Sequence, residues 1–191
     1  RRLELAVNMG NLSERYGLMA GDVVEIMIDE LNIGLLHYND FSLGWEERLK
    51  GKISDLGITD DGVSYHSSNA GGDVNAFSEL IPGLVSEEID VLIAFSTPAA
   101  QAAANLLPED IPLVFTVVTD PVSAGLFELR SNICGLSDAI NLSQILDFSL
   151  EVLPEYATAG RIYNSTEANS VYAQQELEML APLKGISLFG E

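Results

Sequence analysis

Short runs of apolar residues alternate along the chain with segments in which apolar residues recur every three or four positions. The run at 91–95, VLIAF, is uninterrupted, as is typical of a strand buried on both faces. It leads into the strong helix-forming sequence PAAQAAAN, with Ser96 or Thr97 at the N-cap and Pro98 at the first helical position. The pattern therefore predicts a buried strand that feeds directly into a helix.

The same alternation extends to both sides of this unit. Strands and helices are expected in turn at 31–38 (strand), 45–57 (helix), 63–68 (strand), 74–88 (helix), 91–95 (strand), 98–105 (helix), 111–118 (strand) and 132–137 (strand). Regular alternation of this kind predicts an α/β fold with a doubly wound, Rossmann-like parallel sheet and right-handed crossovers.

A second series of elements begins at Asn141. An amphipathic helix is expected to end at Pro154, followed by a strand at 160–164, a helix after an N-cap at Ser165 and a strand at 186–190. We therefore expect a first α/β lobe at 31–138 and an incomplete second lobe at 139–191. Residues 1–30 are interpreted as a helical N-terminal extension.

The turn at residues 96–98 is a candidate binding site. Free amides at the start of this helix point to the carboxyl end of the strand, where a doubly wound sheet binds its ligand. The turn lacks a glycine-rich phosphate loop and offers two hydroxyls, which suits a small anion such as a carboxylate. The alternative is that Ser96 and Thr97 only cap the helix.

The charge of the chain narrows the choice of partner. With 29 acidic and 9 basic residues the formal net charge is -20, which disfavours nucleic acid and anionic membrane surfaces as partners. Between Lys52 and Arg130 there is no Lys or Arg, although twelve carboxylates lie in that interval. A zwitterionic ligand therefore fits this part of the chain better than a phosphate.

Other chemistry has little support in the sequence. Cys134 is the only cysteine, and two histidines without a CxxC motif do not indicate a zinc site, so no cofactor or metal is expected. No apolar segment approaches the roughly 20 residues needed to cross a bilayer. The first residues also lack the apolar core of a signal peptide.

Several motifs together carry a resemblance to a known family. They are NAGGD (69–73), DVLIAFSTPAAQAAAN (90–105), IPLVFTVVTDPVSAG (111–125), GLSDAINL (135–142) and IYNSTEANS (162–170). From about Leu31 to the C-terminus the chain resembles, in the family's order, the ABC-transporter substrate-binding family of the tryptophan/tyrosine-binding type, which has the periplasmic-binding-protein type I fold.

The resemblance implies two doubly wound lobes that close on a small amino-acid-like ligand, with an aromatic amino acid as one option. It implies an extracytoplasmic protein, periplasmic or extracellular and lipid-anchored or secreted, that delivers its ligand to the membrane permease of an ABC importer. It implies binding without catalysis. A sensor domain of the same fold is the alternative, followed by a small α/β enzyme that uses Asp120 or Glu167 as a base.

The resemblance also implies ligand-binding residues in both lobes. They are Tyr38, Asp40, Ser96, Thr97, Thr119, Asp120, Ser137, Asp138, Tyr163, Asn164, Glu167, Asn169 and Ser170. In this interpretation the hydroxyls of the 96–97 turn bind the ligand carboxylate, Asp120 accepts from its ammonium group, and Tyr163 stacks on an aromatic ring.

Five of these residues have an equally simple structural interpretation. Asp120 is a favoured turn residue before proline, and Glu167 fits the third position of a capping box begun by Ser165 or Asn164. Ser137 and Asp138 lie where a hinge is expected, and Tyr38 fits a packed edge aromatic. Outside the set, Trp45 is expected in the core, and His37 and His66, which have no evident partners, are interpreted as structural.

Three features depart from the family pattern. Arg161 stands at an expected strand position where the family has a small or apolar residue, and a later acidic motif of the family is not present up to Glu191. Residues 1–30 resemble the family's C-terminal tail, with Asn8 and ERYGL in comparable places. We therefore expect a longer protein with tandem copies, in which a partner copy completes the second lobe.

Overall fold

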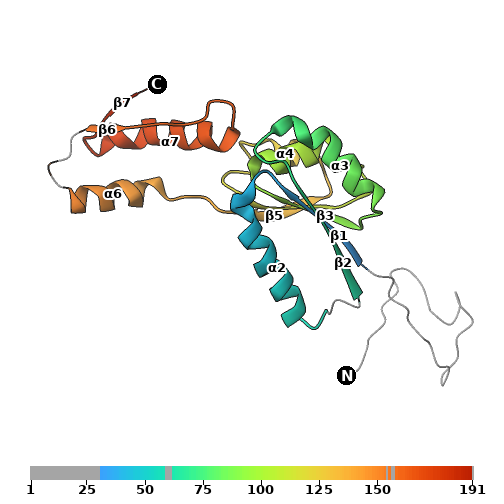
Figure 1. Cartoon of the computed structure of the whole chain (residues 1–191). Helices are drawn as coiled ribbons and strands as arrows, with labels where there is room; N and C mark the ends of the chain where they lie inside the picture. Colours follow the sequence, from blue (N-terminus) through green and yellow to red (C-terminus); the bar gives the residue numbers. More distant parts are fainter. Residues whose placement is uncertain (1–30, 59–61, 154, 156–157, 191) are drawn as a thin grey trace, which may run out of the picture.

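A computed structural model describes residues 31–58, 62–153, 155 and 158–190 of the chain. These residues form two α/β units, which lie at opposite ends of the view in Figure 1. The helical extension expected at 1–30 lies outside the described residues.

The first unit is built on a five-stranded sheet in the order β2-β1-β3-β4-β5, and every strand pair is parallel. The strands are β1 (Leu31–His37), β2 (Val63–Asn69), β3 (Val91–Phe95), β4 (Leu113–Val118) and β5 (Ile133–Ser137). The predicted α/β fold with a doubly wound parallel sheet is confirmed. The strand order reverses between β1 and β3, which is where such a sheet binds its ligand.

Helices lie on both faces of this sheet (Figure 1). They are η1 (Asp40–Ser42), α2 (Leu43–Asp55), η3 (Val74–Ala76), α3 (Phe77–Ser86), α4 (Thr97–Leu106) and α5 (Leu126–Leu129). Successive residues of one strand enter different cores: Leu36 packs in the larger cluster with α3 and α4, and Leu35 in the smaller cluster beside α2. Burial on both faces also explains why β3, in the middle of the sheet, is apolar at every position.

The second unit is smaller. It consists of α6 (Leu142–Val152), β6 (Thr158–Gly160), α7 (Ala168–Leu183) and β7 (Ser187–Phe189), and its two strands pair in parallel. Its buried apolar core is formed by Leu146, Ala181 and Ile186. None of the described helices has the length and apolar character needed to cross a membrane.

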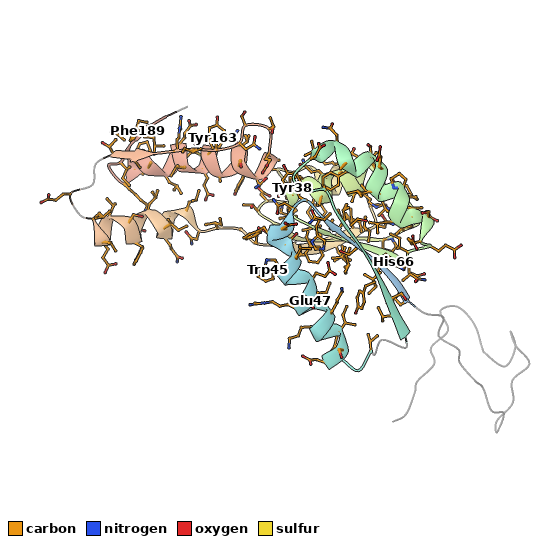
Figure 2. The ribbon with its side chains drawn as sticks, in the orientation of Figure 1. Tyr38, Trp45, Glu47, His66, Tyr163 and Phe189 are labelled. Carbon is orange, nitrogen blue, oxygen red and sulfur yellow. The ribbon has the colours of Figure 1, made fainter. Side chains whose placement is uncertain are left out.

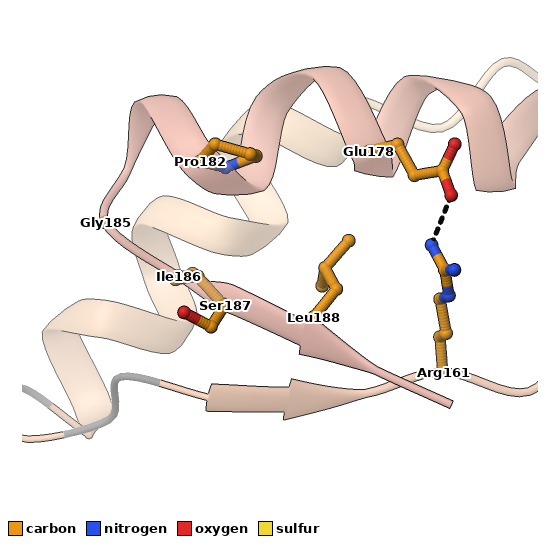
Figure 3. A pocket seen from close by; sticks show the side chains of 7 residues that line it. All are labelled: Arg161, Glu178, Pro182, Gly185, Ile186, Ser187 and Leu188. Carbon is orange, nitrogen blue, oxygen red and sulfur yellow. Dashed lines mark hydrogen bonds and ion pairs between the residues drawn. The ribbon is translucent and has the colours of Figure 1, made fainter. Parts of the chain in front are cut away.

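The strand expected at 160–164 is wrong in its position, because β6 ends at Gly160. The partner strand β7 has three residues and pairs with Thr158–Gly160, so the apolar residues after Gly160 have no further strand to pair with. Arg161 therefore lies beyond the strand and forms an ion pair of 2.6 Å with Glu178 on α7. Figure 3 shows this pair at one end of an open cavity of about 620 Å³ beside β7.

The start of α7 also differs from the prediction. The helix begins at Ala168, with Glu167 as an N-cap residue that makes no side-chain capping bond. Asn164 instead accepts hydrogen bonds from the amide and the hydroxyl of Thr166, at 3.0 and 2.8 Å. This Asx turn occupies the residues that were expected to form the first helical turn, so the capping-box interpretation of Glu167 is wrong.

Trp45 is not a core residue. Its exposed fraction is 47%, and the guanidinium carbon of Arg48 lies 5.5 Å from the ring centroid. α2 packs on the sheet through Leu49 and Ile53, and Trp45 lies beside an open apolar groove of about 740 Å³ over β3, β4 and β5. In the described residues no helix covers this part of the sheet, so Trp45 has little to pack against.

Candidate functional site

The candidate site begins where β1 and β3 end side by side. His37 is the register partner of Phe95 in this strand pair. Tyr38 and Ser96 therefore leave the sheet next to each other, at the point where the strand order reverses. Both are residues that the sequence singled out.

Ser96 has an unusual backbone, with φ of 93°. This region is costly for a residue other than glycine, by about 1–3 kcal/mol, and such strain is concentrated at functional sites. The Ser96 side chain makes no capping hydrogen bond. The interpretation of Ser96 and Thr97 as simple helix caps is therefore not what the structure shows.

The hydroxyls of Ser96 and Thr97 are both buried and have no hydrogen-bond partner within the described part of the chain. Thr97, the first residue of α4, is only 2% exposed. An unsatisfied buried polar group costs about 1–3 kcal/mol. A hydrogen-bonding ligand at the start of α4 would remove this cost.

The NAGGD turn forms the neighbouring wall. The Gly72 amide donates to the Tyr38 carbonyl at 2.7 Å, and the Asn69 side chain accepts from the Gly71 amide at 2.9 Å. Gly71 and Gly72 have φ values of 62° and 88°, a conformation that glycine adopts without strain. The motif is thus explained as a tight turn held against the end of β1.

A cavity of about 430 Å³ lies between these strand ends and the segment before α7. Its lining comes from both units of the protein: Tyr38, Gly72, Asp73, Val74, Phe77, Pro98, Gln101, Ala102, Thr166 and Glu167. A second cavity of about 370 Å³ shares Gln101, Thr166 and Glu167 with it. Residues that are far apart in the sequence therefore meet where α4 packs on α7.

Tyr38 and Glu167 face each other across this boundary. The Tyr38 hydroxyl lies 3.5 Å from Glu167 Oε1, which also accepts from Asn164 Nδ2 at 2.9 Å. Burial and then the negative charge of Glu167 raise the pKa of Tyr38, so the phenol remains a donor. The Tyr38 ring also packs 6.3 Å from Phe77, which makes it both a packed aromatic and a cavity residue.

Asp120 has the geometry of a turn residue. Its Oδ1 accepts from the amides of Val122 and Ser123 at 3.0 and 3.3 Å, and its Oδ2 accepts from the Ser123 hydroxyl at 2.7 Å. The Ser123 hydroxyl is the main cause of the lowered pKa of Asp120. Asp120 lines neither of the two cavities described above.

The ends of β4 and β5 are joined by Ser137. Its hydroxyl donates to the Thr119 carbonyl at 2.8 Å and accepts from the Ala139 amide at 3.2 Å, while the Asp138 amide donates to the Val118 carbonyl. Ser137 and Asp138 are exposed, and the chain passes from here to the second unit. The interpretation of Ser137 and Asp138 as hinge residues stays a prediction.

The remaining predicted residues are dispersed. Asp40 is exposed and accepts from Asn69 Nδ2 at 2.7 Å. Figure 2 shows Tyr163 beside α7 and Tyr38 at the boundary of the two units, so the structure does not bring these two rings together. Asn169, next to the partly buried Ser170, has a buried Oδ1 without a partner within the described residues.

Sequence reasoning missed some residues that line the cavity. Gln101 donates to the Ala124 carbonyl at 3.0 Å and reaches both cavities. It lies four positions after Thr97, on the same helix face, and is the only polar residue in AAQAAA, which is a signal that could have identified it. Asp73 is the last residue of NAGGD and Phe77 follows four residues later, and neither could be assigned to the cavity without the fold.

His37 does have hydrogen-bonding partners. Its Nε2 lies 2.7 Å from Glu46 Oε2, and its Nδ1 lies 2.7 Å from Ser42 Oγ. His66, labelled in Figure 2, lies 3.5 Å from Glu87. The prediction that these two histidines have no evident partners is therefore wrong. Across the described residues, no group of three or more His, Cys, Asp or Glu side chains is arranged to hold a metal ion.

The five-stranded parallel sheet with this strand order and a second α/β unit is the fold of type I periplasmic binding proteins. Residues 44–190 match the family described as ABC transporter substrate binding protein. The chain belongs to this family, which is one of binding proteins rather than of enzymes.

Similarity to individual proteins supports this family assignment. The chain is 36% identical over 123 residues to a tyrosine-binding protein of Clostridioides difficile (strain R20291), covering 62% of this chain and 35% of that protein. A conserved domain protein of Vibrio cholerae O1 biovar eltor matches at a TM-score of 0.78 and 29% identity, over 84% of this chain and 56% of that one.

A third relative is the ABC domain from Streptococcus pneumonia in complex with L-Trp. It matches at a TM-score of 0.79 and 26% identity, over 84% of this chain and 56% of that one. The chain thus spans about a third of the length of the curated relative and just over half of these solved chains.

Proposed function

We propose that this chain is the solute-binding part of an ABC importer and binds an aromatic amino acid between two lobes, 31–138 and 139–191. The observation that carries the proposal is the pair of buried, unpartnered hydroxyls of Ser96 and Thr97 at the start of α4. They lie where β1 and β3 diverge, which is the binding position in sheets of this order.

The ligand carboxylate is proposed to bind at this helix start. Hydroxyl donors and the positive end of the helix dipole stabilise a carboxylate there without a lysine or arginine. Between Lys52 and Arg130 the sequence has neither residue. Because the hydroxyls are covered in the present arrangement, the ligand reaches them when α4 and α7 separate.

The ligand's ammonium group is proposed to lie near Glu167 and Asp73, whose side chains line the cavity of about 430 Å³. Asp120 is a weaker candidate, since both its oxygens already accept hydrogen bonds within its turn. The aromatic rings of Tyr38 and Phe77 supply a surface for an aromatic side chain.

The other predicted residues remain part of the proposal as contacts that form when the lobes close. They are Asp40, Thr119, Ser137, Asp138, Tyr163, Asn164, Asn169 and Ser170. The names of two relatives support the choice of ligand, since one is a tyrosine-binding protein and the other is a complex with L-Trp.

The family supports the remaining parts of the proposal. As a substrate-binding protein of an ABC transporter, the chain would act in the periplasm or outside the cell and deliver its ligand to a membrane permease. A partner copy is proposed to pack on the second lobe, where Phe189 of β7, labelled in Figure 2, is exposed. Sedimentation over a range of protein concentrations tests this part.

Replacement of Thr97 by valine tests the site. The change removes the hydroxyl with little change of volume, and a hydrogen bond to a carboxylate contributes about 1.5–3 kcal/mol, so the affinity should fall about tenfold to a hundredfold. Titration calorimetry with L-tyrosine and with L-tryptophan measures it. Thr116→Val on β4 is the matched control, since Thr116 lines the groove beside α2 instead.

If neither amino acid binds to the unaltered protein, the proposed ligand class is wrong. If Thr97→Val binds as tightly as the unaltered protein, the carboxylate does not lie at the start of α4.

A further inference from the structure

The carboxyl end of β1 carries a buried polar network next to the site. We propose that His37 is a positioning residue for ligand binding: it ties the end of β1 to α2 and to the end of β3, and its protonation weakens binding through Tyr38 and Ser96. This inference rests on the proposed function and adds a regulation by pH to the same site.

The network joins three elements at one side chain. His37 on β1 is fully buried, with Nε2 2.7 Å from Glu46 of α2 and Nδ1 2.7 Å from Ser42 at the end of η1. Glu46 in turn accepts from Ser67 of β2 at 2.8 Å and from Lys50 at 2.5 Å. The bonds of His37 and Ser67 connect β1 and β2 to η1 and α2, whereas the Lys50 bond lies within α2.

The histidine ring also contacts β3. It stacks on Phe95 with centroids 4.5 Å apart and an angle of 10° between the ring planes. Phe95 immediately precedes Ser96, whose backbone is strained, and His37 immediately precedes Tyr38. The ring therefore belongs to the residue before Tyr38 and contacts the residue before Ser96, so a shift of the ring is transmitted to both proposed ligand contacts.

Burial, more than the charges around the ring, favours the neutral form of His37. In the described part of the chain the charged groups that face it are Glu46 and Lys50, both on α2, while β2 contributes the Ser67 hydroxyl and β3 the Phe95 ring. Burial lowers the pKa of His37 below its usual value, and Glu46 opposes this only in part.

Glu46 stays ionised beside the neutral ring. Burial acts to raise the pKa of this carboxyl, but hydrogen bonds from Lys50, Ser67 and His37 outweigh burial and lower it. A neutral His37 then donates from Nε2 to the carboxylate of Glu46 and accepts at Nδ1 from the Ser42 hydroxyl.

Protonation changes this arrangement at one defined atom. A proton added at Nδ1 turns this nitrogen into a donor, so the Ser42 hydroxyl can no longer donate to it and must donate to the Asn39 carbonyl, 3.2 Å away. Asn39 is the N-cap of η1 and follows Tyr38 directly. The first segment to respond is thus the one that positions Tyr38.

The direction of the pH effect follows from the lowered pKa of His37. As the pH falls below about 6.5, the unfolded chain takes up the proton before the folded chain does. The stabilising contribution of neutral His37 is therefore fully present above this pH and is lost as the pH falls through the folded-state pKa. Ligand affinity is expected to fall over the same range.

The test compares the affinity for L-tyrosine by calorimetry at about pH 7.5 and at a pH below the folded-state pKa of His37, which lies under its usual value of about 6.5. A change of one pKa unit on binding corresponds to about a tenfold change in affinity, and we expect a loss of about this size in the unaltered protein. His37→Gln keeps an amide that can donate to Glu46 but cannot take up a proton, so its affinity should be the same at both pH values. His66→Gln, which alters the other histidine, should retain the loss.

Trp45 provides a readout that needs no ligand. It is the only tryptophan and precedes Glu46 on α2, so its emission reports changes in the network. In the ligand-free protein and in His66→Gln we expect an emission change as the pH falls through the lowered folded-state pKa of His37, and none in His37→Gln.

The outcomes separate this inference from the proposed function. If L-tyrosine and L-tryptophan fail to bind at about pH 7.5, the proposed ligand class fails, and the Trp45 emission alone then supports or rejects the titrating network. If His37→Gln lowers the melting temperature but keeps the pH dependence of binding, or if binding to the unaltered protein does not depend on pH, His37 is structural and the inference is overturned.

Discussion

The two sheets of this protein differ in how much they bury. The first has five strands and a core cluster on each face, with Leu35, Leu36 and Leu92 fully enclosed. The second has two strands of three residues and a core of Leu146, Ala181 and Ile186. Because stability depends on the apolar surface that is buried, the first unit has what it needs to fold alone, whereas the second depends on its neighbours.

Because of this difference, the two sides of the candidate site rest on units with different amounts of buried apolar surface. Tyr38, Ser96 and Thr97 stand on the well-buried sheet, while Thr166 and Glu167 precede the helix of the smaller unit. Precise positioning requires rigid support, and movable elements come from regions of low local stability. In the proposed site we therefore expect a fixed side that binds the carboxylate and an opposite side that can move.

The largest expected effect comes from the same truncation made in each core. Leu92→Ala should lower the free energy of unfolding by about 3–5 kcal/mol, and Leu146→Ala by about 1–2 kcal/mol, since a small cluster can relax around the cavity. Denaturant unfolding measures both values. Hydrogen exchange should show weaker protection at 160–190 than in β1 and β3 already in the unaltered protein.

Equal losses for the two variants, together with uniform protection across both sheets, would mean that the two units unfold as one. The conclusion that the first unit is more stable than the second would then be wrong.

The second comparison uses one arginine from each unit. Arg130 is buried and donates to the Leu107 carbonyl at 2.7 Å, to the Ile111 carbonyl at 2.5 Å and to the Pro108 carbonyl. Arg130→Met removes these three hydrogen bonds and should cost about 2–4 kcal/mol. The Pro108 and Ile111 carbonyls still accept from the Ile111 amide and from Asn132 Nδ2. Loss of the exposed Arg161–Glu178 ion pair in Arg161→Met should lower the free energy of unfolding by less than about 1 kcal/mol.

The denaturant midpoints of the two arginine variants measure these two losses of stability. A loss in Arg161→Met that matches the loss in Arg130→Met would show that the second unit is held as firmly as the first.

The third prediction asks whether the second unit takes part in binding. Glu167→Gln removes the negative charge proposed to face the ligand's ammonium group and should weaken L-tyrosine binding about tenfold, as expected for a lost hydrogen bond between charged groups. Glu151→Gln on the exposed side of α6 is the control. Unchanged calorimetric affinity in Glu167→Gln would confine the site to the first unit.

The smallest expected effect is that of salt. A zwitterion carries no net charge to screen, and Arg130 and Arg161 are already engaged within the protein, so the affinity should change less than about twofold between low and high ionic strength. Calorimetry in increasing NaCl measures it. A steep loss would point to an anionic ligand and to a role for one of these arginines.

The sequence predicted the strands and helices of the first unit well, because the residue patterns that define them are local. The run at 91–95 is a strand with the same bounds as predicted, and Pro98 follows the first residue of its helix. A continuous apolar run between turn residues has few alternatives once it is buried on both faces.

The second unit was harder to predict, because its bounds depend on pairing and on side-chain hydrogen bonds. Ile162 and Tyr163 have strand-forming side chains, but β7 pairs with the residues before them. Ser165 has the character of an N-cap, but Asn164 forms a turn first and delays the helix to Ala168.

The site was predicted in part for the same reason. The hydroxyls at 96–97 follow a strand directly, so the sequence could place them at its end. The partners of His37 are five and nine residues away across a strand–helix junction, and no periodic pattern connects them. Glu167 reaches Tyr38 only through the packing of two units, which the sequence alone does not specify.

The position of Thr166 and Glu167 has a kinetic consequence. Within the described residues the chain passes once between the two units, at 138–141, so their separation meets little covalent resistance. A ligand beneath this wall escapes only when the wall moves, whereas entry is limited by diffusion and orientation. Weakening the contact between Tyr38 and Glu167 should therefore shorten the residence time of the ligand and leave its association rate almost unchanged.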